Sequence, residues 1–486
     1  MKNAVVIGAG IGGIATAIRL ANKGFKTKVF EVSDKPGGKL NEFSLGEYRF
    51  DFGPSLFTLP ELVNELFRIS GRNPDDYFEY DRIELACKYF WQDGTVLMAW
   101  SDPDRLAGEV EKKFNIDKKR LLKYLNDRSE IYKTVSPLFL ERSLHKFKGL
   151  LPATRRDILK YIFRLGIITS MNRMNKRELK HPKLVQLFNR MATYNGSNPY
   201  QAPAILTIIS SLEHGDGVYF PVGGMYSITK ALVKLAKELG VEFLFNEKVL
   251  EISRDHSKVT GVRTLLGEYP ADLVVSNMDV VPTYKQLLNG FRQPTRILDR
   301  ERSSSALVFY WGIGKSYSEL ELHNIFFSDD YKSEFDALFK SKRISRDPTI
   351  YVHISSRCEP GDAPEGSENW FVMVNAPSNY GQKWDSIIER TRENVIEKLE
   401  KVLGKNIRDH INEEYILDPR ILEDKTFSFR GSLYGTSSNS KFAAFLRHPN
   451  FSSKIKGLYF TGGSVHPGGG IPLCLLSAKI VSEMAE

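Results

Sequence analysis

The sequence predicts an α/β fold that combines a Rossmann-type dinucleotide-binding domain on a parallel sheet, a domain on a mixed or antiparallel sheet, and a helical region. Three observations predict this class. The apolar strand Ala4–Ile7 runs into a glycine loop, the apolar strand Thr27–Phe30 ends at the acid Glu31, and alternating apolar strands follow from about residue 303. The chain has 486 residues, which is more than one ordinary hydrophobic core accommodates, so two or more domains are expected. A content of 42% hydrophobic and 26% charged residues is typical of a folded globular protein.

The glycine loop has the spacing of a dinucleotide-binding turn, Gly8-x-Gly10-x-x-Gly13. Gly8 makes the tight turn, Gly10 lets the backbone approach a pyrophosphate, and Gly13 lets the following helix pack closely on the strand. The helix N-terminus then presents free N–H groups and a positive partial charge to the diphosphate. Gly12 belongs to the same predicted site, and Glu31 is placed to accept both hydroxyls of the adenosine ribose.

The residues after the ribose acid distinguish between the two common dinucleotides. A second glycine turn and a cation follow, Gly37-Gly38-Lys39, and then the stretch "RFDFGPSLF" with Ser55 and Leu56. Nicotinamide enzymes rarely need these features, whereas the longer flavin dinucleotide must be approached again beyond its adenosine half. The pattern therefore favours FAD over NAD, with Gly38, Lys39, Ser55 and Leu56 as contacts and Lys39 as the counter-charge to phosphate. We find no second GxGxxG after a strand, which argues against NADPH bound in the same chain.

A second glycine loop lies at the other end of the chain, in "TGGSVHPGGGIPLCLLSAKIVSEMAE". An apolar strand precedes Gly463, and Pro472 suits the first position of a helix that we expect over Leu473–Met484. Because the first loop already accounts for the diphosphate, we expect the second to hold the reactive ring of the same cofactor. Gly463, Gly470 and Ile471 are the predicted contacts, and the helix dipole would favour negative charge on the reduced ring.

These motifs together resemble the phytoene desaturase family of FAD-dependent carotenoid desaturases, which is related to amine oxidases and protoporphyrinogen oxidase. The resemblance is carried by GxGxxG, Glu31, Gly37-Gly38-Lys39 and the terminal "GGSVHPGGGIP", and it spans the chain. The stretch "GVYFPVGGMYSITKALVKLAKELG" (217–240) also looks like the central block of the family. The N-terminal motif is shared by many flavoproteins, whereas the C-terminal block is more specific to carotenoid desaturases.

The resemblance implies further contacts and a substrate. Val249 would meet the adenine through its backbone, Asn277 would lie near the dinucleotide, and Leu433, in "FRGSLYGTSS", would contact the flavin. The implied partner is a hydrophobic carotenoid. The terminal block looks most like the branch that desaturates 1-hydroxycarotenoids at the 3,4 position. Phytoene desaturase is the close alternative, a flavin-dependent carotenoid isomerase a second, and a non-catalytic carotenoid carrier a third from outside the enzyme class.

The domains are predicted to be discontinuous. The expected division is a FAD-binding domain over 1–75, 217–285 and 425–486, a substrate domain with an antiparallel sheet over 76–109 and 286–424, and a mainly helical, basic, membrane-associating region over 110–216.

The basic charge of the chain is concentrated in one segment. Residues 142–190 contain 13 Lys or Arg against two acids, a local charge of +11 in a chain whose formal charge is +9. Arg156, Lys160 and Arg164 recur at four-residue spacing, which suits a helix lying on an anionic membrane surface. A solvated basic face is the alternative. No nucleic-acid-binding module accompanies the charge, and neither an export signal nor a spanning segment is visible. We therefore expect a cytoplasmic, peripherally membrane-associated protein.

The sequence offers few groups for chemistry other than the cofactor's. The three cysteines lie far apart and form no metal-ligand pattern, so no metal site is expected. Desaturation removes a hydride and a proton, and the weak candidates for a proton acceptor are Asp157 and His466; neither is assigned an essential role. The predicted enzyme is an FAD-dependent oxidoreductase that introduces a C=C bond into an acyclic C40 carotenoid. Its oligomeric state and final electron acceptor are left open.

Overall fold

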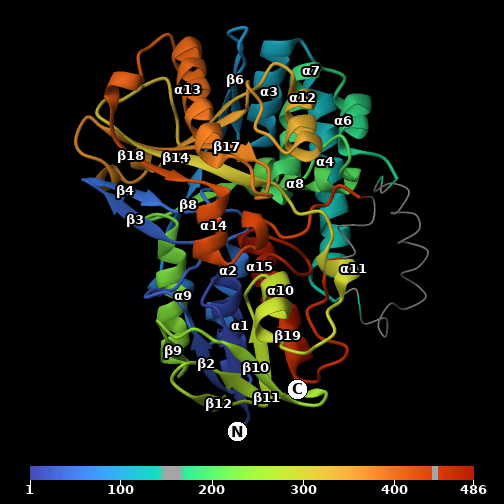
Figure 1. Cartoon of the computed structure of the whole chain (residues 1–486). Helices are drawn as coiled ribbons and strands as arrows, with labels where there is room; N and C mark the ends of the chain where they lie inside the picture. Colours follow the sequence, from blue (N-terminus) through green and yellow to red (C-terminus); the bar gives the residue numbers. More distant parts are fainter. Residues whose placement is uncertain (144, 146–165, 167, 441–446, 486) are drawn as a thin grey trace.

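A five-stranded parallel sheet forms one end of the molecule, the lower end in Figure 1. The computed structural model describes residues 1–143, 145, 166, 168–440 and 447–485. The strand order of the sheet is β19-β13-β1-β2-β9, and every neighbouring pair is parallel. Its strands are β1 (Asn3–Ile7), β2 (Lys26–Phe30), β9 (Glu242–Leu244), β13 (Leu273–Ser276) and β19 (Leu458–Phe460).

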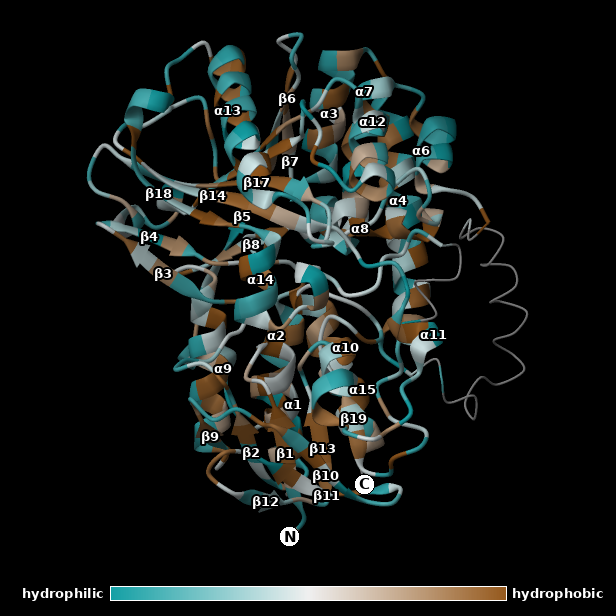
Figure 2. Cartoon of the chain, in the orientation of Figure 1, coloured by the Kyte–Doolittle hydropathy of each residue, from teal (hydrophilic) through white to brown (hydrophobic). Residues whose placement is uncertain are grey.

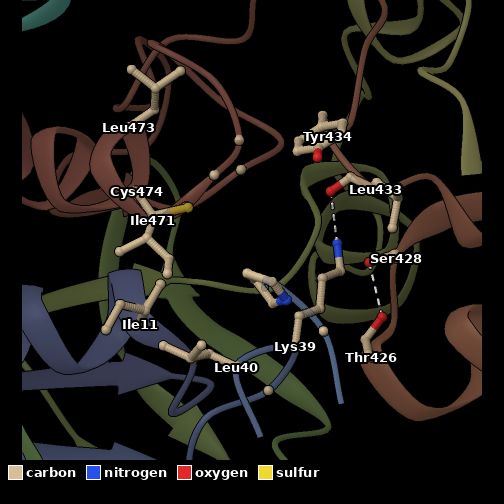
Figure 3. Close-up of a pocket in the computed structure, with 18 of the residues that line it drawn as sticks. Ile11, Lys39, Leu40, Thr426, Ser428, Leu433, Tyr434, Ile471, Leu473 and Cys474 are labelled. Carbon is tan, nitrogen blue, oxygen red and sulfur yellow. Dashed lines mark hydrogen bonds between the residues drawn. The ribbon is translucent and has the colours of Figure 1, made fainter. Parts of the chain in front are cut away.

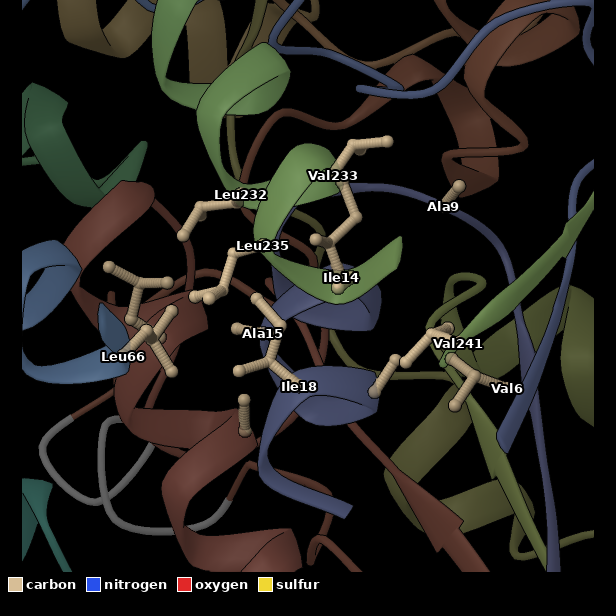
Figure 4. Packing of buried hydrophobic residues seen from close by; sticks show 14 of the residues in the cluster. Val6, Ala9, Ile14, Ala15, Ile18, Leu66, Leu232, Val233, Leu235 and Val241 are labelled. Carbon is tan, nitrogen blue, oxygen red and sulfur yellow. The ribbon is translucent and has the colours of Figure 1, made fainter. Parts of the chain in front are cut away.

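Side chains of β1 alternate between two buried faces of this sheet, because successive residues of a strand point to opposite sides. Val6 belongs to the apolar cluster on the helical face; Figure 4 shows it beside Val241, with Ile14 and Ile18 of one helix packed toward Leu232 and Leu235 of another. Val5 packs on the other face. The helices are α1 (Ile11–Asn22), α2 (Glu61–Ile69), α9 (Tyr226–Glu238) and α15 (Ile471–Met484); the other face is covered by β10 (Glu251–Asp255), β11 (Lys258–Arg263), β12 (Glu268–Pro270) and α10 (Val280–Pro282).

A seven-stranded mixed sheet forms the opposite end, in the order β18-β14-β17-β16-β15-β6-β7. All pairs are antiparallel except β15 with β6. The strands are β6 (Leu85–Phe90), β7 (Val96–Trp100), β14 (Ser305–Ile313), β15 (His323–Phe326), β16 (Ile350–Ile354), β17 (Glu368–Ala376) and β18 (Ile411–Leu417). The predicted α/β class with a parallel sheet and a mixed sheet is confirmed.

The two faces of the mixed sheet pack against different parts of the molecule. Leu307 and Phe309 of β14 pack beneath α13 (Trp384–Leu403), whereas Ala306 and Val308 face the interior of the molecule. Figure 2 shows brown strands in both sheets and teal on the outer face of α13. The interior face of the mixed sheet is the one that meets the cavity described below.

A group of short helices packs beside the mixed sheet and supplies one side of the interior. It comprises α3 (Pro103–Phe114), α4 (Lys118–Val135), α6 (Met171–Leu179), α7 (Pro182–Asn189), α8 (Ile209–Ser211), α12 (Tyr331–Asp336) and the helical turns Ser136–Leu140, Arg190–Asn195, Ala204–Ile208 and Leu212–Asp216. Among the described residues, no helix is both long and apolar enough to cross a bilayer. Arg156, Lys160 and Arg164 lie outside the described residues.

The remaining elements connect the two ends. They are β3 (Glu42–Leu45), β4 (Tyr48–Asp51), β5 (Tyr80–Ile83), β8 (Val218–Pro221), α11 (Thr295–Leu298) and α14 (Pro419–Thr426). The central glycine block has a structural function here. Buried Asp51 accepts from the Met225 N–H at 3.1 Å, at the start of α9, and a methyl group added at Gly224 would lie 2.4 Å from the Arg49 guanidinium. Gly224 also has φ +82°, so the backbone conformation favours glycine at this position.

Candidate functional site

A cavity of about 1210 Å³ lies between the two sheets and is lined by residues from both. Its lower wall is the carboxyl end of the parallel sheet. Gly8, Glu31 and Asn277 each directly follow the last residue of a strand, and Gly462 follows β19 after one residue. In open α/β sheets, ligands bind in the crevice at this edge.

The first glycine loop is shaped by contacts within the chain as well as by the cavity. Gly8 has φ +94°, in the region that favours glycine, and a methyl group added at Gly13 would lie 2.1 Å from the Gly8 carbonyl oxygen. Gly8, Gly10 and Gly12 line the cavity, whereas Gly13 does not. Gly10 caps α1 without a side-chain hydrogen bond, so the N–H groups of the first turn have no side-chain acceptor.

Asn277 lies between the two glycine loops. A methyl group at Gly10 would lie 2.8 Å from its amide nitrogen, and methyl groups at Gly12 and Gly462 would lie 2.8 and 2.6 Å from its amide oxygen. The amide nitrogen also donates to the Gly8 carbonyl at 3.4 Å. The loops from opposite ends of the chain therefore meet around one side chain, and larger residues at these glycines would push them apart.

One end of the cavity carries two carboxylates. Glu31 is 8% exposed and accepts from the Ala9 N–H at 2.7 Å and the Ser33 N–H at 3.0 Å. Glu247 is 5% exposed, and its Oε1 has no hydrogen-bond partner among the described residues. An unpaired buried acceptor beside a cavity fits a ligand that brings donors, such as the hydroxyls of a ribose. Sequence reasoning missed Glu247, although it lies two residues before the predicted contact Val249.

The second glycine loop, which precedes the C-terminal helix α15, also lines the cavity (Figure 3). Gly470 has φ +99° and ψ 156°, and a methyl group there would meet nothing within 4 Å. It caps α15 without a side-chain hydrogen bond. The helix begins at Ile471, not at Leu473, so Pro472 occupies its second position instead of the predicted first. This is a small correction, because Pro lacks an N–H that the second position also leaves unpaired.

Lys39 follows the glycine turn Gly37-Gly38, beside the first loop, and its side chain extends across the cavity to Leu433. Its backbone follows Gly38, whose added methyl would lie 3.5 Å from the Cα of Gly10, and its Nζ donates to the Leu433 carbonyl at 3.0 Å. Figure 3 shows this bond opposite Ile471 and Cys474. Burial lowers the pKa of Lys39, partly offset by Asp279 and Cys474, and burial raises the pKa of the Cys474 thiol to about 11.

The structure brings nearly all predicted cofactor contacts to this one cavity. Those that line it are Gly8, Gly10, Gly12, Glu31, Gly38, Lys39, Ser55, Leu56, Val249, Asn277, Leu433, Gly463, Gly470 and Ile471. Gly13 instead packs beneath the loop. His466 also lines the cavity, whereas Asp157 lies outside the described residues.

His466 is the one described candidate for a proton acceptor, and it is only 2% exposed. Its Nε2 lies 3.0 Å from the Arg142 carbonyl; a carbonyl only accepts, so this nitrogen carries the proton and Nδ1 is left as a free acceptor. Nδ1 has no hydrogen-bond partner among the residues that the structure describes. Burial lowers the pKa of His466 to about 4, so the imidazole is neutral at pH 7 and only a weak base.

Beyond the predicted contacts, the cavity extends into an apolar arm that sequence reasoning missed. We use this name for the lining residues Tyr132, Val135, Phe139, Leu140, Ile205, Ile208, Ala306, Val308, Phe371, Met373 and Leu417. They come from α4, the turns after it and the interior face of the mixed sheet. No local motif marks them, because they are spread over about 290 residues and only the fold assembles them. In the described ranges, no cluster of His, Cys, Asp and Glu has the arrangement of a metal site.

Comparisons with known proteins agree with this geometry. The chain matches the family of flavin-containing amine oxidoreductases over residues 11–484. It is 50% identical to the 1-hydroxycarotenoid 3,4-desaturase of Flavobacterium sp. (strain P99-3) over 100% of this chain and 99% of that protein. It is 34% identical to a 4,4'-diapolycopene oxygenase of Methylomonas over 99% and 97%. An oxidoreductase structure from Methanosarcina mazei superposes with a TM-score of 0.62 at 17% identity, covering 99% of this chain and 100% of that one.

The chain belongs to the flavin-containing amine oxidoreductase family, and the predicted resemblance to FAD-dependent carotenoid desaturases is confirmed. It is an FAD-dependent oxidoreductase. The predicted cofactor fits the observed site, where one cavity is faced by helix N-termini without side-chain caps, by close glycine loops and by a Glu247 oxygen that has no partner among the described residues.

Proposed function

We propose that this protein introduces a C=C bond into an acyclic C40 carotenoid, by 3,4-desaturation of a 1-hydroxycarotenoid. The observation that carries the proposal is that one cavity is lined by the glycine loops and Lys39 and also by the residues of the apolar arm. A polyene is a long hydrocarbon and needs such an arm. The relative at 50% identity, named for this reaction, supports the choice of substrate.

In the proposed reaction the chain binds the cofactor and the substrate, and bound FAD supplies the acceptor for the hydride. The chain holds the cofactor through predicted residues, from Gly8 and Glu31 at the adenosine end to Gly463 and Gly470 at the other, and through Glu247, which was not predicted, at the adenosine end. The N-terminus of α15 and the Lys39 cation give positive potential on the side of the second loop, which favours negative charge there. The apolar arm excludes water from the reacting carbons.

The proton that leaves the substrate needs an acceptor, and we propose His466 for this position. Its Nδ1 is an unpartnered acceptor within the described part of the chain, and its ring lines the cavity. Because burial makes His466 a weak base, its effect on rate is expected to be modest, about 100-fold or less. The variant His466→Gln should lower kcat while leaving FAD content unchanged. Unchanged kcat would remove His466 from the reaction.

The test of the function is the mass of the product. Purified holoprotein is incubated without oxygen with a 1-hydroxylated acyclic carotenoid, and separately with phytoene. We expect the hydroxylated substrate to lose two hydrogens and the flavin to bleach. Product from phytoene alone would indicate a phytoene desaturase, and unchanged mass with isomerised product would indicate an isomerase. A gain of oxygen when air is admitted would indicate an oxygenase like the Methylomonas relative. No bleaching with any polyene would favour a carrier.

We also propose that the protein works at an anionic membrane surface, from which a water-insoluble polyene is drawn. The support is the basic segment 142–190 and, in its described part, the exposed cations of α6 and its end, Arg173, Lys176 and Lys180. In this proposal the chain divides as the sequence predicts, with 110–216 as the membrane-facing region, the discontinuous FAD-binding domain over 1–75, 217–285 and 425–486, and the substrate domain over 76–109 and 286–424.

Vesicle cosedimentation tests the membrane proposal. Replacing Arg173, Lys176 and Lys180 together with Glu should abolish binding to vesicles that contain phosphatidylserine. The matched control replaces three exposed lysines near the parallel sheet, Lys26, Lys234 and Lys237, with Glu and so makes the same change in net charge. Equal loss of binding in both variants would indicate a general charge effect, and retained binding in the first would contradict a membrane-facing α6.

A further inference from the structure

Part of the cavity lining, on the side of the mixed sheet, is a polar cluster that the proposed mechanism does not use. We call it the polar end; its lining residues are Arg190, Glu213, His323, Tyr331 and Tyr351. It stands on β15 and β16, two inner strands of the mixed sheet, on α12, and on the two helical turns Arg190–Asn195 and Leu212–Asp216. The neighbouring strands β14 and β17 contribute apolar lining residues such as Val308 and Met373. The cavity lining is thus mainly polar along β15 and β16 and mainly apolar along β14 and β17.

The charges of the polar end already balance each other. Arg190 Nη2 donates to the two oxygens of Glu213 at 2.9 and 3.1 Å and to the Tyr89 hydroxyl at 2.7 Å. The Tyr194 hydroxyl donates to the same carboxylate at 2.6 Å. Burial raises the pKa of Glu213, but Arg190, His214 and Tyr194 outweigh it and lower the pKa overall. A buried ion pair with these partners has no charge left for an ionic ligand, so the group that binds here is neutral.

His323 of the polar end and His353, which contacts it, are both neutral. A chain of short contacts joins Ser55 Oγ to the Tyr351 hydroxyl at 2.8 Å, the hydroxyl to His323 Nδ1 at 2.8 Å, and that nitrogen to His353 Nδ1 at 3.2 Å. Burial, the neighbouring His353 and Arg190 lower the pKa of His323 well below its ordinary value. Burial also lowers the pKa of His353 to about 3. Nδ1 of His323 is therefore engaged, and its Nε2 is the atom available to a ligand.

Three polar atoms of this cluster have no hydrogen-bond partner within the described part of the chain. They are His323 Nε2, the Tyr331 hydroxyl and Arg190 Nε, in side chains whose residues are 2%, 5% and 7% exposed. Buried polar atoms without partners are rare because each costs free energy. Three such atoms in one part of a cavity lining indicate that a ligand or water forms hydrogen bonds with them.

We propose that the polar end binds the neutral hydroxyl group of a substrate whose remainder is hydrocarbon. A hydroxyl both donates and accepts, so it pairs with His323 Nε2 in either tautomer and with the Tyr331 hydroxyl at the same time. This inference rests on the proposed function and names the residues that select the hydroxylated substrate. It also accounts for position: Ser55, a proposed cofactor contact, is one hydrogen bond from Tyr351 of the same cluster, so a hydroxyl held here keeps nearby carbons beside the cofactor.

The test compares two substrates that differ only in the hydroxyl: a 1-hydroxylated acyclic carotenoid and the same polyene without it. Wild type should have the higher kcat/KM for the hydroxylated one. Tyr331→Phe removes only an unpartnered hydroxyl, so we expect normal Tm and FAD content, a loss of about tenfold in kcat/KM for the hydroxylated substrate, and no change for the other. His323→Phe should show the same selective loss. Tyr77→Phe, which removes an exposed hydroxyl bonded to Glu238 outside the cavity, is the matched control and should change neither value.

The outcomes separate this site from the proposed function. Equal losses on both substrates, or an unchanged ratio in Tyr331→Phe and His323→Phe, would overturn the hydroxyl site while leaving the desaturase activity standing. Wild type that converts neither carotenoid would contradict the proposed function and this site with it. If Tyr331→Phe lost FAD or fell in Tm, the hydroxyl would be structural and the proposal would be wrong.

Discussion

The two glycine loops look alike in the sequence and differ in what their glycines do. Each follows a strand of the same parallel sheet and begins a helix that has no side-chain cap, α1 in one case and α15 in the other. In the first loop a methyl group at Gly13 would overlap the Gly8 carbonyl at 2.1 Å. In the second, a methyl group at Gly470 would meet nothing within 4 Å, yet the backbone lies at φ +99°.

The difference separates two reasons for glycine. At Gly13 the chain leaves no room for a side chain, so the residue is required for folding. At Gly470 there is room, and that room is the cavity itself, so glycine is required by backbone conformation and by the ligand. Substitutions at the two positions should therefore fail in different ways.

The largest effect is expected at Gly13. Gly13→Ala places a methyl group against a backbone oxygen that cannot move without displacing β1, and we expect a loss of more than about 4 kcal/mol in the free energy of unfolding. The control is Gly108→Ala in α3, where nothing lies within 4 Å and helix propensity improves by about 1 kcal/mol. Thermal unfolding of both variants is the measurement. A folded Gly13→Ala protein with wild-type Tm would contradict the packing argument.

Gly470 should affect the cofactor more than the fold. Gly470→Ala carries only the backbone strain, about 1–3 kcal/mol, whereas Gly470→Leu also fills the cavity. We expect Gly470→Leu to fold but to lose FAD or lower its reduction potential, and Gly470→Ala to retain much of its FAD. Flavin absorbance per mole of folded protein separates the two. Normal flavin content, potential and turnover in Gly470→Leu would show that the second loop does not hold the cofactor.

A buried histidine, His448, contacts the second loop and makes the stability of the protein depend on pH. The His448 carbonyl accepts from the His466 N–H at 3.0 Å, and burial lowers the pKa of His448 to about 4. Because the unfolded pKa is about 6.5, this contribution to stability is complete above pH 6.5 and is lost as pH falls toward 4. Between pH 7 and 5 we expect a loss of about 2 kcal/mol from this residue. Denaturant unfolding at pH 7 and pH 5 measures the free energy of unfolding. In His448→Gln this free energy should fall by about 2 kcal/mol less between the two pH values than in wild type. An equal fall in both proteins would exclude His448 as the cause.

The smallest expected effect concerns Lys39, which lines the cavity between the two loops and donates to the Leu433 carbonyl. Its ammonium is bonded to a neutral carbonyl inside the cavity, so removing it should weaken a contact to an anionic cofactor. Lys39→Met should raise the Kd for FAD about tenfold, or ~1.4 kcal/mol. Lys26→Met, an exposed lysine on β2, is the control. Titration of apoprotein with FAD measures both, and equal Kd values would remove Lys39 from the cofactor site.

Much of this site was visible in the sequence because its parts are local. The first loop, Glu31 and Gly37-Gly38-Lys39 lie within one continuous stretch, and glycine spacing reports directly on backbone conformation. The error in the predicted helix boundary was small. α15 begins at Ile471, because a helix can start one residue before Pro472 as easily as at Pro472 itself. Glu247 was missed because a single acid in a turn has no distinguishing pattern until burial shows its unpaired oxygen.

The sequence by itself determined the fold class, the family and the cofactor, since each is indicated by local motifs, within which the residues lie close together and their spacing sets the chemistry. Only the tertiary structure decided that the two glycine loops meet around Asn277, that the apolar arm continues from them, and that Arg190, His323 and Tyr331 gather at one end. These groups are brought together by β-sheet pairing over hundreds of residues, and side chains so far apart carry no sign of one another until the strands are paired.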